Sequence, residues 1–259
     1  MTTSAASSPP EPAPIDRPAT TLADRGSVRY DAVASARWTV SGAAKVAKDV
    51  NVGALGLQGT LSIGGKLSAT TLRGRGTLET EGPIEVTGTL ALAGTVRAPG
   101  PIHAGDLDVN GTLRCERGVT IDRTGSIVGS LETSGLKAGA FLLKGAGRVP
   151  GRLEVGTFTA ELRESSTLGT LVGRFVQVHG KVPTVVDKAL FRDAEFRVDR
   201  IEAEAVSLEG VEVAFVRANQ IVLGRACHVT EVEGTIVRRH PTSYVGPESR
   251  TPPPYGLRR

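Results

Sequence analysis

The sequence is poor in cysteine, in aromatic residues and in long apolar runs. Only two Cys occur in 259 residues, Cys115 and Cys227, whereas small secreted scaffolds are usually dense in disulfides. We therefore expect both thiols to be reduced and buried and to have a structural role. No apolar run approaches the roughly 18 residues of a membrane-spanning helix, and the N-terminus lacks a charged segment followed by an apolar one. The sequence thus predicts no signal peptide and a cytoplasmic location.

The aromatic residues are one Trp, three Tyr and six Phe, fewer than a conventional globular core of this size would usually hold. Helix signals are also weak, because 32 residues are Gly and each Gly inside a helix costs about 1 kcal/mol relative to Ala. A thin core filled by Leu, Val, Ile and Ala fits this composition. The Phe residues recur at a fairly even spacing and are expected to pack in the core or at corners, with an exposed stripe for lateral bundling as the alternative: Phe141, Phe158, Phe175, Phe191, Phe196 and Phe215.

A Gly-Thr-Leu triplet returns at a near-constant interval of about 17–18 residues, and a fixed period of this kind sets the architecture of the fold. Its copies begin at Gly59, Gly76, Gly94, Gly111 and Gly129, with Val in place of Leu in the third copy and Ser in place of Thr in the fifth. Another copy begins at Gly88, two thirds of a period after the second. The repeat therefore divides into three shorter steps of equal length.

The apolar positions in the first half of the chain advance by one such step each time, which fits neither a helix nor a simple alternation. Several have an apolar partner two positions on, such as Leu61 with Ile63, so that both side chains lie on one face of a short strand. A Gly then breaks the strand. Three short strands per period describe one turn of a single-stranded parallel β-helix, an all-β solenoid with turns about 4.8 Å apart. The hairpin signal Asn110-Gly111 falls on a corner of this repeat, and the stretch from Asp199 to Glu212 keeps the same step and is expected to be strand.

Composition divides the chain into three regions. Residues 1–35 are rich in Ala, Ser and Pro and are expected to be disordered, because they cannot bury enough apolar surface. Residues 36–239 carry the β-helix, with about 11 turns of the period, and residues 240–259 form a second disordered tail that is basic and Pro-rich. From Arg238 onward there are five Arg against one Glu, which matches the net charge of +4 of the whole chain. A basic tail either attracts acidic partners or lipid head groups or is simply solvated; the candidate contacts are Arg238, Arg239, Arg258 and Arg259.

The period is disturbed once, between Gly129 and the next matching corner at Gly151, which are separated by more than one period. We expect a corner loop near residues 134–147 to contain the surplus.

The Gly-Thr-Leu corners, the stretch 46–53, and the runs 151–155, 201–208 and 221–224 resemble the bactofilins, which are polymer-forming cytoskeletal proteins of bacteria. The resemblance covers roughly residues 42–237. It implies a right-handed β-helix and a non-enzymatic scaffold that polymerises without nucleotide by stacking of β-helix ends. It also implies client proteins or cell-wall machinery as partners, often at the membrane. The common family core is about half this length, and the N-terminal tail here holds only Ile15 and Leu22 as bulky aliphatic residues, so membrane contact stays open.

The ends of a solenoid expose unpaired backbone groups and need caps. The sequence offers no obvious amphipathic helix as a cap, so another rod could add to each end strand on strand. The alternative is that the terminal apolar residues are ordinary core residues of intact turns. The candidate contact residues are Val50, Val52, Leu55 and Leu57 in the first turns, and Val229, Val232 and Ile236 in the last.

Residues that could carry catalysis or bind a cofactor form no recognisable motif. The four His (His103, His179, His228 and His240) are scattered without zinc-ligand spacing, and the folded part shows no basic stripe with the aromatic platforms of a nucleic-acid groove. The sequence therefore predicts no enzyme, no cofactor, no metal and no nucleic acid. Two alternatives use similar steps: a left-handed β-helix acyltransferase or carbonic-anhydrase-like enzyme, and a surface β-solenoid adhesin or ice-binding protein. The first would need a more regular hexapeptide and active or zinc-binding His, and the second a secretion signal or regular Thr ladders.

Overall fold

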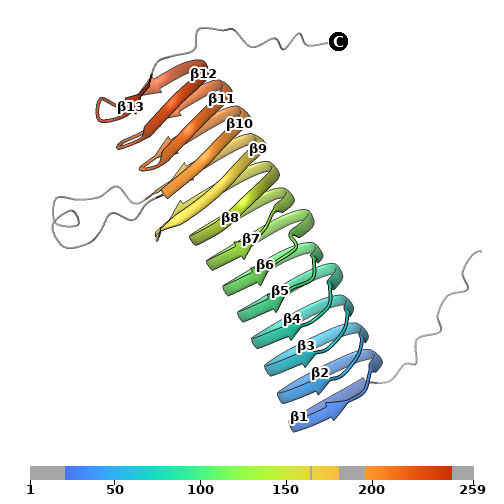
Figure 1. Cartoon of the computed structure of the whole chain (residues 1–259). Coiled ribbons are helices and arrows are strands. Elements are labelled where there is room, and N and C mark those ends of the chain that lie inside the picture. Colours follow the sequence, from blue (N-terminus) through green and yellow to red (C-terminus); the bar gives the residue numbers. More distant parts are fainter. Residues whose placement is uncertain (1–20, 164, 181–195, 247–259) are drawn as a thin grey trace, which may run out of the picture.

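A computed structural model of the chain describes residues 21–163, 165–180 and 196–246. The described residues form one parallel sheet of 13 strands that pair in the order of the sequence, wound into a β-solenoid of about 12 turns (Figure 1). The predicted all-β solenoid is therefore confirmed, while its right-handed winding stays a prediction. At about 4.8 Å per turn the rod is about 55 Å long.

The strands are β1 (Thr21–Tyr30), β2 (Val33–Val46), β3 (Val50–Ile63), β4 (Leu67–Thr80), β5 (Ile84–Ala98), β6 (Ile102–Cys115), β7 (Val119–Thr133), β8 (Leu136–Leu162), β9 (Ser166–His179), β10 (Phe196–Glu209), β11 (Glu212–Leu223), β12 (His228–Arg239) and β13 (Tyr244–Val245).

Most strands bend around three sides of one turn, so the three predicted short strands are three sides of a single bent strand. In β3, Val50 and Val52 point inward from the first side, Leu55 and Leu57 from the second, and Leu61 and Ile63 from the third; all six are buried. The residue between each inward pair points outward. Stacking of such pairs from turn to turn fills the bore, and we use the names first, second and third side for every turn.

The glycines of the repeated triplet form one column at the corner between the second and third sides. Each pairs with the next: Gly42, Gly59, Gly76, Gly94, Gly111, Gly129 and Gly145. All seven have φ between 129° and 142°, a conformation that L side chains rarely adopt. A Cβ on Gly76 would lie 1.8 Å from the carbonyl oxygen of Gly59. The triplet is therefore required by the stacking of backbone on backbone, and Asn110-Gly111 lies on this corner as predicted.

The expected loop near residues 134–147 is absent: only Ser134 and Gly135 separate β7 from β8, and β8 is continuous strand from Leu136 onward. Gly129 pairs with Gly145, slightly less than one period further along the chain. A Cβ on Gly151 would instead meet the carbonyl oxygen of Ser134, at the corner between the third and first sides. Gly151 therefore belongs to a different column from the triplet glycines. The apparent surplus came from joining two corners, because the true match reads Gly145-Ala146-Gly147 and lacks the triplet pattern.

The position of the strand break moves along the rod at β8. From β2 to β7 each strand ends after its third side, whereas β9 to β11 end after their second side. β8 runs through five sides without a break, so the shift in the position of the strand end occurs within it. At its end Gly145 pairs with Leu162, and Arg163 N donates a hydrogen bond to Gly145 O (3.0 Å). The stretch from Asp199 to Glu212 falls on β10 and β11, so its prediction as strand is confirmed.

The predicted N-terminal boundary is too late. The first strand begins at Thr21 and the second at Val33, within the segment 1–35 that was expected to be disordered. At the other end, β13 pairs Tyr244 with His228 and Val245 with Val229, so the coil passes residue 239. Residues 1–20 and 247–259 lie outside the described part of the chain.

The Phe residues do not form one stripe. Phe141 and Phe158 stack inside the rod with ring centroids 6.3 Å apart, and Phe196 is buried. Phe175 is 51% exposed on the outside, and Phe215 lies at a different corner beneath the guanidinium of Arg200. Phe191 lies outside the described residues. Among those residues, no helix is long and apolar enough to cross a membrane.

Candidate assembly surfaces

The predicted contact residues of the N-terminal end lie in the body of the rod. Val50, Val52, Leu55 and Leu57 belong to β3, which pairs with β2 on one side and β4 on the other, and all four are buried. They are core residues of an interior turn and cannot meet another rod. The prediction was wrong because the turn of β1 was assigned to a disordered tail and β3 was taken as the first turn in place of β2.

The N-terminal end of the described rod is the turn of β1, whose bore holds a polar cluster. The Asp24 carboxylate accepts hydrogen bonds from Tyr30 Oη (2.7 Å) and from Trp38 Nε1 (2.7 Å). Tyr30 packs edge-on against Trp38, which is fully buried in β2. The hydrogen bond to Asp24, with smaller effects of burial and of the Asp24 charge, raises the pKa of Tyr30 above its ordinary value of 10.0. We call Asp24, Tyr30 and Trp38 the polar end cluster.

Sequence reasoning missed this cluster although a signal was present. Gly26 stands about one period before Gly42, as Gly42 does before Gly59, and the structure pairs Gly26 with Gly42 in the glycine column. The column therefore begins one period earlier than the triplet does. Asp24 occupies an inward position, where an apolar residue was expected, and this hid the turn.

The C-terminal end matches the prediction in part. Val229 and Val232 are buried in β12, Val229 beneath β13, so these two are core residues. Ile236 is half-buried against the core, and the neighbouring Val237 is 61% exposed. Because β13 pairs only with residues 228 and 229, the outer edge of β12 from Thr230 onward has no strand partner in the described part of the chain.

The candidate tail contacts lie in two places. Arg238 and Arg239 are the last residues of β12 rather than part of a tail, and Arg239 donates hydrogen bonds to the carbonyl oxygen of Ser243 (Nε 3.2 Å, Nη2 3.0 Å). Arg258 and Arg259 lie outside the described residues.

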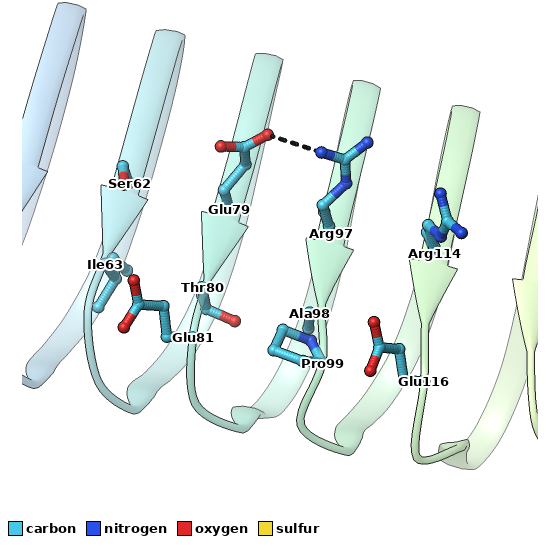
Figure 2. A pocket seen from close by; sticks show the side chains of 10 residues that line it. All are labelled: Ser62, Ile63, Glu79, Thr80, Glu81, Arg97, Ala98, Pro99, Arg114 and Glu116. Atoms are coloured by element: carbon cyan, nitrogen blue, oxygen red, sulfur yellow. Dashed lines mark ion pairs between the residues drawn. The ribbon is translucent and has the colours of Figure 1, made fainter.

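An open groove runs across the third sides of β3 to β6 and the corners that follow them (Figure 2). Glu79 and Arg97 form an ion pair (3.6 Å) across neighbouring turns, and Arg114 pairs with Glu132 of the next turn (3.2 Å). Glu81 and Glu116 lie at the corners of the same groove. A small-molecule site usually encloses most of its ligand, whereas this groove is a solvated row of opposite charges, which is suited to polar contact with another surface.

The scattered His residues remain apart in the structure. His103 lies 2.9 Å from Asp122, His179 lies 3.3 Å from Glu209, and His228 stacks edge-on with Tyr244. Within the described ranges, no group of three or more His, Cys, Asp or Glu could hold a metal ion.

Both cysteines are free and buried, as predicted. Burial raises the pKa of each thiol. The Sγ atom of Cys115 donates to the carbonyl oxygen of Gly118 (3.1 Å), and Thr133 Oγ1 donates in the same way to Gly135 (3.1 Å). Cys115 thus closes a corner as Thr133 does in the next turn, which is a structural role.

Known proteins do not assign the chain to a family. Comparison with protein-family models, curated proteins and solved structures gives no match.

Proposed function

We propose that this protein is a non-enzymatic scaffold that assembles end to end into filaments without nucleotide and positions other proteins along them. The observation that carries the proposal is the open backbone edge at each end of the described rod. Within the described residues, β1 pairs only with β2, and β12 pairs with β13 over two residues. An exposed strand edge presents a row of unpaired N–H and C=O groups, which is a template for another strand.

The C-terminal edge combines backbone groups with apolar surface. Along residues 230–239 the edge is long enough for about five inter-strand hydrogen bonds, each of which contributes about 0.5–1.5 kcal/mol. Ile236 and Val237 expose apolar area beside this edge, and covering that area by a second rod would add to the contact. The N-terminal edge offers the whole length of β1, with Leu22 and Val28 partly exposed at its inner face.

Client binding in this proposal uses the sides and the tails. The charged rows on the first and third sides suit polar partners, and Arg258 and Arg259 suit acidic partners or anionic lipid head groups. A cytoplasmic location belongs to the same proposal, because both thiols are free, as is usual in a reducing compartment.

The test is electron microscopy of the purified full chain in buffer without nucleotide. We expect filaments whose axis follows the rod. A chain that stays monomeric overturns the proposal, as does a monodisperse trimer that binds a metal ion or acyl-CoA.

A pair of variants locates the contact. Ile236→Glu places a charge at the C-terminal end of the bore and should shorten or abolish the filaments, because a buried unpaired charge opposes stacking. Thr120→Glu is the matched control, since Thr120 is an exposed outward residue of β7 in the body of the rod, and its filaments should be unchanged. Separate deletions of residues 1–20 and 247–259 complete the test, since loss of filaments in either would show that the bare strand edges do not suffice.

A further inference from the structure

One surface of the rod carries no charge over six consecutive turns. It is the second side from β7 to β11, whose outward residues are Ser126, Leu142, Thr159, Gln177, Ser207 and Val222. The residue two positions before each of these is also uncharged and at least partly exposed, including Phe175 at 51%. We call these two columns the uncharged face.

The other two sides of the same turns are charged. Outward residues of the first side include Lys137, Glu154 and Glu202, and those of the third side include Arg148, Arg197 and Glu212, several of them in ion pairs. The uncharged face also holds a groove beside Phe175, lined by Thr159, Ala205 and Val222 among others. A sheet face of hydroxyl, amide and apolar side chains, with an aromatic ridge and a groove beside it, is the kind of surface that packs against another sheet.

A column of alternating basic and acidic residues borders the uncharged face. It runs through Lys144, Glu161, His179 and Glu209 on four successive turns, in which Lys144 pairs with Glu161 (2.9 Å) and His179 with Glu209 (3.3 Å). Val128 precedes Lys144 in this column. Basic and acidic residues therefore alternate along the rod at the edge of a neutral surface.

We infer that a second copy of this chain packs its uncharged face against this one, with the two rods antiparallel. A two-fold axis midway between the turns of Thr159 and Gln177 places Lys144 opposite Glu209 of the second copy and Glu161 opposite its His179. The same axis sets Phe175 against the small side chains of Thr157 and Thr159. Lys144 then faces a carboxylate, and each of the two carboxylates of the bordering column faces a basic side chain.

A parallel arrangement with the turns in register is disfavoured by the charges on the other border. Arg174 and Glu204 flank the uncharged face at the corner between the first and second sides. In parallel rods with the turns in register, Glu204 would face Glu209 of the second copy, so that two carboxylates meet. In the antiparallel arrangement Arg174 and Glu204 fall opposite Gly156 and Gly139, which carry no charge.

The area of the uncharged face determines how strongly two copies bind through it. Six turns span about 24 Å between the first and last strand, and three residues across give a width of about 10 Å, so the footprint is on the order of 240 Å² per copy. A stable interface buries about 800 Å² per partner. One contact is therefore weak, and pairing becomes firm when many copies along two filaments act together; in this respect the inference rests on the proposed function.

The first experiment compares filament width by electron microscopy. The unaltered chain should give paired filaments, and Phe175→Glu should give single ones of unchanged length, because the charge is buried in the contact. Thr167→Glu, an exposed outward position on the third side of the same turn, is the matched control and should leave the pairs intact. Single filaments from the unaltered chain overturn the inference and leave the proposed function standing.

The second experiment uses disulfide cross-linking and does not require filaments. Leu142 and Ser207 lie three turns apart in one chain, about 14 Å, which is too far for a disulfide, but the two-fold axis sets them opposite each other between copies. The double variant Leu142→Cys with Ser207→Cys should form covalent dimers with diamide, several-fold more than either single variant, while Cys115 and Cys227 are buried. Equal cross-linking by a single variant, or none by the double variant, contradicts the antiparallel pairing even if the chain forms no filaments.

Discussion

The N-terminal and C-terminal halves of the rod turn the same corner in two ways. From β2 to β8 the corner between the second and third sides is an unbroken strand, built on glycines with φ between 129° and 142° that stack directly on one another. After Gly145 the same column passes to the buried Leu162 and later to Gly210 and Ala226, whose φ values of 63° and 51° are left-handed. There the strand ends and a short turn follows.

This difference shows that the solenoid requires Gly at this corner in one half of the rod only. The first half needs Gly because a backbone carbonyl lies where a Cβ would be. The second half ends the strand at that corner and instead runs unbroken through the next one, as at Arg152, Thr170 and Arg200. The inward pairs and the inter-turn pairing continue through both halves. The period therefore specifies the fold, and the Gly-Thr-Leu triplet is one of two ways in which the chain forms this corner.

The largest effect should come from breaking the glycine column. Gly76→Ala combines φ of 129° with a Cβ 1.8 Å from a backbone oxygen, so we expect a loss of about 5 kcal/mol or more in the free energy of unfolding. Gly26→Ala is the control, because φ is 86° there but nothing lies within 4 Å; it should cost only about 1–2 kcal/mol. Urea denaturation followed by circular dichroism measures both. Equal losses would show that backbone strain, and not stacking, makes glycine necessary.

The next effect tests the junction between the halves. Phe158→Ala removes a fully buried ring that stacks on Phe141 and should cost about 3–5 kcal/mol through the cavity left behind. Phe175→Ala removes the same ring from the outside of the next turn and should change stability by less than about 1 kcal/mol. Chemical denaturation again gives the values. A small loss for Phe158→Ala would mean that the turns of β8 collapse to fill the space.

A moderate effect is expected at the polar end cluster. Asp24→Ala leaves Trp38 Nε1 buried without its acceptor and should cost about 1–3 kcal/mol. Because the folded pKa of Tyr30 is raised, its contribution to stability is complete below pH 10.0 and is lost as the pH rises through the raised value. Ultraviolet titration should show one tyrosine that ionises late, and this late step should move to lower pH in Asp24→Asn. A titration unchanged by that substitution would contradict the assigned hydrogen bond.

The smallest effect lies in the C-terminal half and has the opposite sign. Ala226 adopts a left-handed φ of 51°, which strains an L residue by about 1–2 kcal/mol, whereas Gly destabilises through unfolded-state entropy by about 0.4–1 kcal/mol. Ala226→Gly should therefore stabilise the protein by about 0.5 kcal/mol, the difference between strain and entropy, in contrast to Gly76→Ala. Thermal unfolding of the two variants in parallel checks the signs. If Ala226→Gly instead destabilises the protein, the side chain of Ala226 is required at this corner.

The period made the solenoid and its strongest corners predictable, because stacked backbone leaves a direct trace in the sequence as Gly at fixed intervals. Three features could not be predicted from the sequence, each for a physical reason. The turn of β1 carries Asp24 at an inward position, since an end turn tolerates a hydrogen-bonded carboxylate where an inner turn needs an apolar residue. The switch at β8 was hidden because Gly145 and Gly151 belong to different corners. The uncharged face depends on which residues of distant turns share a side, which only the register fixes.

The pairing of each turn with only its two neighbours also determines how the rod bears force. Tension along the axis passes through every turn-to-turn contact in series, and within one contact the backbone hydrogen bonds share the load, as along the full length of the pairing between β2 and β3. Stiffness is then a property of the whole rod, whereas strength is that of its weakest contact. Force applied through β13 would part its contact with β12 first, because that contact has only two residue pairs, and would leave the longer coil intact.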